Sequence, residues 1–137
     1  MASFAALLAA ASLGAMLFFS AVVTPTMFTT LKADAAGLFL RRVFPRYFLV
    51  NGALAGIAAA LAAAASAATP AILMAVGAVI LLASRQFVVP IINEARDAAD
   101  AGDAAAKKRF DAWHTGSVVA NLVEMALLAG AIYLLLA

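Results

Sequence analysis

Residues 47–84 read YFLVNGALAGIAAALAAAASAATPAILMAVGAVILLAS and contain no charged side chain. A helix crosses the hydrocarbon core of a bilayer in about 20 residues, so this run is too long for one crossing and long enough for two. We expect the break at Pro70, because proline lacks a backbone donor and suits the first turn of a new helix. The run therefore predicts two membrane helices, over about 47–67 and 71–98.

The flanking regions predict two more membrane helices. Residues 1–31 carry no charge, which indicates a first helix over about 3–31, and the apolar C-terminal stretch indicates a fourth over about 105–136. The chain is 67% hydrophobic and 12% charged, whereas soluble domains average about 45–50% and about 25%. We therefore predict an all-α protein: one domain, residues 1–137, forming an integral membrane four-helix bundle.

The basic residues predict the orientation in the membrane. All 9 lysines and arginines lie in or beside two connections, between Lys32 and Arg46 and between Arg85 and Arg109. The positive-inside rule places both connections in the cytoplasm and both termini outside. Segment 32–46 mixes apolar and basic residues, which favours a short helix lying at the membrane interface. Segment 91–113 is hydrophilic and is interpreted as a solvated extension of the third helix and a turn near Gly102.

Small residues and prolines mark two features of the membrane helices. Gly52 and Gly56 form a GxxxG pair, which lets helix backbones approach closely either inside one bundle or between protomers. The sequence leaves that choice open. Pro25 and Pro90 lie near the charged ends of the first and third helices, where each can kink its helix or end it.

Four polar residues interrupt the apolar fourth helix. His114, Ser117, Asn121 and Glu124 are separated by three, four and three positions, which predicts that they line one helix face. An ionisable group at the bilayer centre costs about 2.5–3.5 kcal/mol on insertion scales. Such a stripe therefore needs a polar partner or a wet cavity.

Counting residues along the helices indicates a partner for Glu124. With the outer ends at Ala71 and Ala137, a rise of about 1.5 Å per residue places Arg85 roughly 21 Å and Glu124 roughly 20 Å inward. Asn51 falls near the same level. We predict an Arg85–Glu124 ion pair, with Asn51 and Asn121 adding hydrogen bonds. This polar layer serves equally well as a device that fixes helix register and as a binding site for an ion, a proton or a polar ligand.

Several function classes are excluded or disfavoured. The chain has no cysteine, which excludes disulfides, thiolate metal sites and cysteine redox chemistry. His114 is the single histidine, and it fits a hydrogen-bonded role better than a proton or ion role or a haem or metal ligand. No enzyme motif is present, so catalysis is not expected, and neither is a cofactor. A net charge of +2 does not indicate nucleic acid as a partner.

Several stretches resemble the transmembrane protein 205-like family. They are GAMLFFSAVVTPTMFTTL, AGLFLRRVFPRYF, RQFVVPIINEARD and RFDAWHTGSVVANLVEM. The most specific parts are VVTPTMF, FPRYF and the pattern F-x-x-x-H-x-x-S-x-x-x-N, which falls on Phe110, His114, Ser117 and Asn121. The resemblance implies a four-helix integral membrane protein of the bacterial inner membrane, whose bacterial members are catalogued as a domain of unknown function. A eukaryotic relative is linked to drug and metal-compound resistance, which implies export or membrane handling of metal species.

Three functional hypotheses follow. The first is a transporter-like or channel-like homo-oligomer, in which Arg85, Asn121 and Glu124 line a narrow conduit and His114 stands at its cytoplasmic mouth. The second is a non-catalytic accessory subunit that packs its small-residue faces against a larger membrane complex. The third, a haem or quinone enzyme, needs an axial ligand or a redox group.

Overall fold

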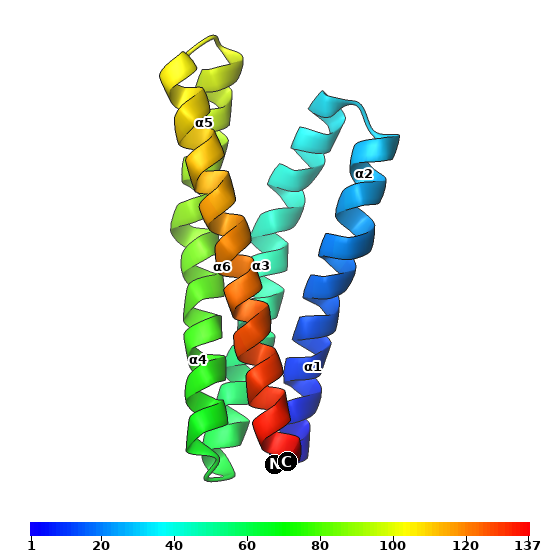
Figure 1. Cartoon of the computed structure of the whole chain (residues 1–137), viewed down its shortest axis with the longest axis vertical. Coiled ribbons are helices and arrows are strands. Elements are labelled where there is room, and N and C mark those ends of the chain that lie inside the picture. Colours follow the sequence, from blue (N-terminus) through cyan, green and yellow to red (C-terminus); the bar gives the residue numbers. More distant parts are fainter.

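The computed structural model describes residues 1–137 as four long membrane helices (Figure 1). The first is formed by α1 (Ala2–Phe18), the π-helical segment η1 (Phe19–Val23) and α2 (Thr24–Thr30), and the second is α3 (Ala33–Ala64). The third is formed by α4 (Ala68–Ala83), the π-helical segment η2 (Ser84–Val88) and α5 (Val89–Asp100), and the fourth is α6 (Ala104–Leu136). Each is long and apolar enough to cross a membrane. The predicted all-α, multi-pass membrane bundle is confirmed.

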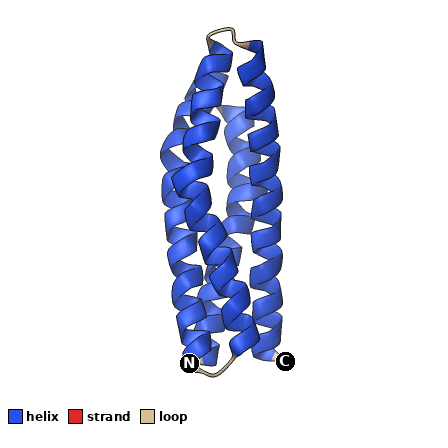
Figure 2. Cartoon of the chain, turned by 90° about the vertical axis from the view of Figure 1, so that its left-hand side faces the viewer, coloured by secondary structure: helices blue, strands red, loops and turns tan.

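The connections sort to the two ends of the bundle. Both termini and connection 65–67 lie at one end, here called the terminal end (Figures 1 and 2). Connections 31–32 and 101–103 lie at the other, here called the charged end. The arrangement agrees with four crossings, while the assignment of the charged end to the cytoplasm stays a prediction.

Local chemistry defines the two tight turns. Ser66 has a φ of 60° and Gly102 a φ of +99°, the left-handed conformation that ends helices. Asp103 then caps α6, because its Oδ1 accepts hydrogen bonds from the backbone N–H groups of Ala105 at 2.8 Å and Ala106 at 3.0 Å. Segment 91–113 thus consists of an extension of the third membrane helix, a turn, and the first residues of α6.

The second and third membrane helices begin earlier than the sequence predicts. The expected separate interfacial helix over 32–46 is wrong, because α3 runs unbroken from Ala33 through Pro45. Breaking a helix near the membrane leaves backbone groups without partners, whereas a proline inside a helix is tolerated where neighbours satisfy the groups it frees. The third membrane helix begins at Ala68, which leaves Pro70 in its first turn, where no backbone donor is missed.

Two prolines produce matching π-helical segments rather than helix ends. Each segment finishes two residues before a proline, Pro25 or Pro90. The N–H of Thr24 bonds to the carbonyl of Phe19, and the N–H of Val89 bonds to that of Ser84, five residues back in both cases. The proline ring clashes with the carbonyl four residues earlier, and the widened turn relieves that clash. Both helices therefore continue past their prolines toward the charged end.

The GxxxG pair is used inside the bundle. A Cβ on Gly52 would lie 2.9 Å from Cγ and Cδ2 of Leu82, and one on Gly56 would lie 3.9 Å from the Cβ of Ala78. Both glycines therefore let α3 approach α4, which answers the question that the sequence left open for this pair. The core around them is mostly alanine, with Met16, Met74, Leu81 and Leu128 as its fully enclosed large apolar side chains.

Gly52→Ala is expected to destabilise the bundle by about 1–3 kcal/mol, because the new methyl group overlaps the branch of Leu82. Gly56→Ala is the matched control on the same helix and meets only an ordinary contact. It should be neutral or stabilising by up to about 1 kcal/mol, since alanine favours helix over glycine. Unfolding in mixed detergent micelles measures both, and equal melting of the two variants would contradict the close α3–α4 approach.

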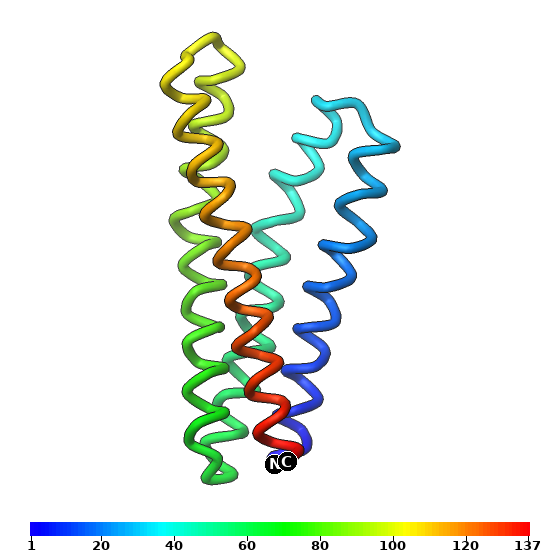
Figure 3. The backbone as a smooth tube through the Cα atoms, viewed as in Figure 1, coloured from blue at the N-terminus to red at the C-terminus, as the bar shows by residue number.

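The membrane helices diverge toward the charged end. Figures 1 and 3 show α2 and the first half of α3 leaning away from α5 and the first half of α6. Two contacts tie these pairs together. Arg41 forms a two-pronged ion pair with Asp97, and the Arg96 guanidinium lies against Gly37. At the charged end the two helix pairs are thus joined to each other by polar contacts, whereas in the terminal half they are joined by apolar packing.

Candidate functional site in the polar layer

A buried hydrogen-bonded ladder links the first two membrane helices. Ser12 Oγ donates to Asn51 Oδ1 at 3.0 Å, and Asn51 Nδ2 donates to the backbone carbonyl of Tyr47 at 2.8 Å. Ser12 is 0% and Asn51 2% exposed. The Asn51 side chain therefore uses both its acceptor and its donor group, as a buried amide requires.

Tyr47 extends the ladder to the fourth membrane helix. Its hydroxyl donates to Asn121 Oδ1 at 2.9 Å. The Tyr47 ring belongs to an aromatic cluster, with ring centroids 4.9 Å from Phe19, 6.1 Å from Phe44 and 5.2 Å from Phe48. Phe19 lies in η1, so the cluster packs the π-helical turn of the first membrane helix against α3. The ring orientation fixes where the hydroxyl reaches α6.

Glu124 is the exception in this layer. It lies three residues beyond Asn121 on α6, is 0% exposed, and neither carboxyl oxygen has a hydrogen-bond partner. Burying a polar group without a partner is costly, and burying its ionised form is far more so. Glu124 is also among the few large side chains that are fully enclosed. The core thus holds a carboxyl group that nothing in the fold neutralises.

The predicted Arg85–Glu124 ion pair is absent. Arg85 is exposed, and its Nε donates to the carbonyl of Pro45 at 3.2 Å. The early start at Ala68 explains the difference, because a rise of about 1.5 Å per residue then places Arg85 about 26 Å from the terminal end. Glu124 lies only about 18 Å from that end, counted from Leu136. Ser84, the neighbour of Arg85, takes the buried position instead.

His114 and Ser117 do not join the layer either. His114 is exposed and stacks on Phe110, with ring centroids 5.7 Å apart, and Ser117 Oγ donates to the carbonyl of His114 at 2.7 Å. At 3.6 residues per turn, His114 is displaced about 80° around the helix from Glu124. His114 therefore lies on the surface, whereas Ser117 is half-buried but bonds within its own helix, and only Asn121 and Glu124 belong to the layer.

Sequence reasoning missed Ser12 and Tyr47. Ser12 is the only polar side chain between Phe4 and Phe19, and the count of residues places it about 15 Å from Ala2, close to the depth of Glu124. An isolated polar residue at this depth is therefore enough to predict Ser12 as part of the layer. Tyr47 carried no comparable signal, because a tyrosine beside charged residues is also typical of a membrane interface.

The side chains present decide which chemistry the layer supports. Nowhere in the chain do three His, Asp or Glu side chains converge as metal ligands would. What the layer holds is one carboxyl group beside two amides and two hydroxyls. A lone carboxyl group can exchange a proton, and the neighbouring amides and hydroxyls can donate and accept hydrogen bonds.

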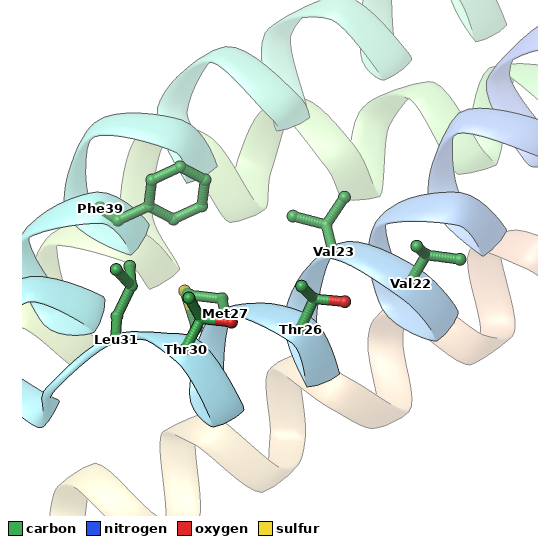
Figure 4. A pocket seen from close by; sticks show the side chains of 7 residues that line it. All are labelled: Val22, Val23, Thr26, Met27, Thr30, Leu31 and Phe39. Atoms are coloured by element: carbon green, nitrogen blue, oxygen red, sulfur yellow. The ribbon is translucent and has the colours of Figure 1, made fainter.

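A groove near the charged end is a weaker candidate. It lies between η1, α2 and α3, has a volume of ≈ 360 Å³, and is shown in Figure 4. Its lining is apolar apart from two threonines, and consists of Val22, Val23, Thr26, Met27, Thr30, Leu31 and Phe39. Without a charged or titratable group it offers no chemistry beyond apolar contact, so the candidate site is the polar layer.

A comparison with known families matches residues 7–101 to the model described as Domain of unknown function (DUF4149). The chain belongs to this family. The matched range of this DUF4149 chain includes Ser12, Tyr47 and Asn51, while α6 with Asn121 and Glu124 follows it. No curated protein and no solved structure matches the chain.

Proposed function

We propose that this protein transfers protons across the membrane and that Glu124 takes up and releases the proton. The observation that carries the proposal is a fully enclosed carboxyl group without a partner at the level of a polar layer. In the closed bundle Glu124 holds its proton, because an ionised carboxylate there would be uncompensated. Ionisable residues inside a membrane are functional candidates by default.

The contacts separate a structural from a chemical part of the layer. Ser12, Asn51, Tyr47 and Asn121 satisfy one another and join three membrane helices. Glu124 contributes no bond to this ladder, so helix register does not depend on it. Burying Glu124 lowers the stability of the fold, and its carboxyl group makes no stabilising hydrogen bond. A functional role therefore explains this residue better than a packing role.

A proton fits the layer better than a metal ion as the transferred species. A metal ion needs several converging ligands, and the layer offers one carboxyl group. Two hollows, of ≈ 340 and ≈ 360 Å³, lie between the first membrane helix and α3. The smaller one reaches Tyr47 and Asn51 but not Glu124, and the alanine-rich core leaves little room for a hydrated ion beside the carboxyl group. The narrower assignment to the transmembrane protein 205-like family is part of this proposal. That family resemblance implies handling of metal compounds at the membrane. In this proposal, proton transfer through Glu124 would drive that handling.

Access to Glu124 is proposed to come from the charged end. The membrane helices already diverge there, and only two polar contacts join α3 to α5, the half-exposed Arg41–Asp97 ion pair and the contact of Arg96 with the buried Gly37. π-helical turns are frequent at functional sites, and η1 and η2 provide such turns in the first and third membrane helices. A small opening at this end admits water to the layer without unpacking the terminal half.

Proton flux into liposomes tests the proposed function. Purified protein is reconstituted with an enclosed pH-sensitive dye, and a potassium gradient with valinomycin imposes the driving potential. We expect the lumen pH to change faster than in protein-free liposomes and in the direction set by the potential. Equal rates with and without protein, at either sign of the potential, would exclude the proposal.

A second candidate is an accessory role in a larger complex of the bacterial inner membrane, or a homo-oligomer. The small-residue stripe of α3 continues beyond Gly56 to Ala60 and Ala64, and these two residues are exposed. Exposed small residues on a membrane helix permit close approach of another helix. Purification in mild detergent distinguishes the cases, because an accessory subunit elutes with a stoichiometric partner and a homo-oligomer elutes as a single chain type.

A further inference from the structure

An apolar groove opens between the first membrane helix and α3 on the outside of the bundle. It has a volume of ≈ 340 Å³, and its walls include Ala15, Phe18 and Phe19 from one helix and Val43 and Val50 from the other. Phe18 and Val50 are exposed. At this depth the surroundings are lipid chains, so the groove has the shape and polarity that an extended hydrocarbon chain can fill.

Two arginines stand at the charged end of this groove. Arg46 lines it, and Arg42 lies one turn further along the same face of α3. Both are exposed and neither forms an ion pair, whereas Arg41 next to them is paired with Asp97. Arg46 uses one donor on the carbonyl of Arg42 at 2.6 Å, which turns its guanidinium toward the charged end. Both guanidinium groups keep free donors, since each carries five.

The depth of the arginines fits the headgroup region. Asn51 is hydrogen-bonded to Ser12 and so lies at its level, about 15 Å from Ala2. Arg42 is nine residues closer to the charged end, which places it about 29 Å from the terminal end of the bundle. The hydrocarbon core is about 30 Å thick. The groove therefore lies within the hydrocarbon, with Arg42 at its boundary and Arg46 reaching toward it.

We propose that this groove and its two arginines bind one anionic phospholipid. An acyl chain occupies the groove, and the phosphate oxygens accept hydrogen bonds from Arg42 and Arg46, which guanidinium groups favour. Charge selects the occupant, because two unpaired cations beside an apolar groove match a negative headgroup on a hydrocarbon chain. This inference does not rest on the proposed proton transfer.

Native mass spectrometry of protein extracted from liposomes tests the inference. The liposomes contain equal parts of phosphatidylcholine and phosphatidylglycerol, and the measured quantity is the fraction of protein that retains each lipid. We expect preferential retention of one phosphatidylglycerol. The double variant Arg42→Gln/Arg46→Gln should retain it on the order of 10- to 30-fold less. This factor is expected because each of the two arginines contributes separately to the free energy of binding an anionic lipid.

Two further variants keep the test specific. Ala15→Phe fills the groove without changing any charge, and it should also reduce retention. Arg85→Gln/Lys108→Gln removes two exposed, unpaired cations that do not line the groove, and it should leave retention unchanged. Equal retention of both lipids, normal retention by Ala15→Phe, or equal loss in the control pair would each overturn the proposal. Melting temperatures within a few degrees of the parent protein establish that the variants are folded.

Discussion

Glu124→Gln is expected to abolish proton flux in liposomes, with a loss on the order of 100-fold or more, the scale on which a positioned acid or base acts. Glutamine has nearly the shape of a protonated glutamic acid but cannot release a proton. Because Glu124 makes no hydrogen bond, the substitution breaks no contact, and the free energy of unfolding should change by less than about 1 kcal/mol. Infrared difference spectra after a pH jump should lack the carbonyl band of a protonated carboxyl group in this variant.

Two matched variants make the Glu124 prediction specific. Glu94→Gln makes the same chemical change at an exposed position and should leave flux unchanged. Arg85→Gln removes the residue that the sequence predicts as the ion-pair partner of Glu124. A true buried pair would cost about 3–5 kcal/mol on losing one partner. The observed contact is one hydrogen bond to the carbonyl of Pro45, so a loss of no more than about 1 kcal/mol is expected.

The outcomes separate function from structure. Normal flux in Glu124→Gln would show that the proton does not pass through this residue. Lost flux together with a large drop in stability would show that Glu124 stabilises the folded bundle, and the loss of flux would then not establish a proton-carrying role. Lost flux with unchanged melting is the result that the proposed function requires.

The number of membrane helices followed from the sequence, because lipid imposes a simple rule on it. A spanning helix must be long, apolar and internally hydrogen-bonded, so uncharged runs and Pro70 were enough to count four. The starts of the first and fourth helices also followed, to within one residue, but those of the second and third did not. A charged residue or a proline does not mark where a helix begins, because Arg41, Arg42 and Pro45 all lie inside α3. A helix continues as long as its backbone bonds are favourable, and side-chain charges mark only where it leaves the hydrocarbon.

The polar layer followed in part, and its errors come from geometry. Asn51, Asn121 and Glu124 were placed at one level, and the structure brings them to adjoining positions in the interior. Arg85 lies outside the layer because its helix begins at Ala68, three residues earlier than the sequence predicts, and because residue counting does not give the direction of its side chain. The π-helical segment η2 contains Arg85, and a periodicity of 3.6 does not describe which way a side chain points from such a turn.

Asn51→Ala is expected to lower the free energy of unfolding by about 1–3 kcal/mol, because it leaves the Ser12 hydroxyl without its acceptor in a dry core and removes the bond to the Tyr47 carbonyl. Ser12→Ala removes one of these bonds, and interhelical hydrogen bonds in membranes average about 0.6 kcal/mol. Unfolding of both single variants and the double variant in mixed micelles gives the coupling energy of the pair. We expect the double variant to be less destabilised than the sum of the two single-variant effects.

Two outcomes would contradict this prediction. Additive effects would mean that Ser12 and Asn51 act independently, and melting equal to that of the parent protein would mean that the ladder does not fix helix register. Register would then have to depend on helix packing, such as the close approach of α3 to α4 at Gly52, and the ladder would lose the structural role assigned to it.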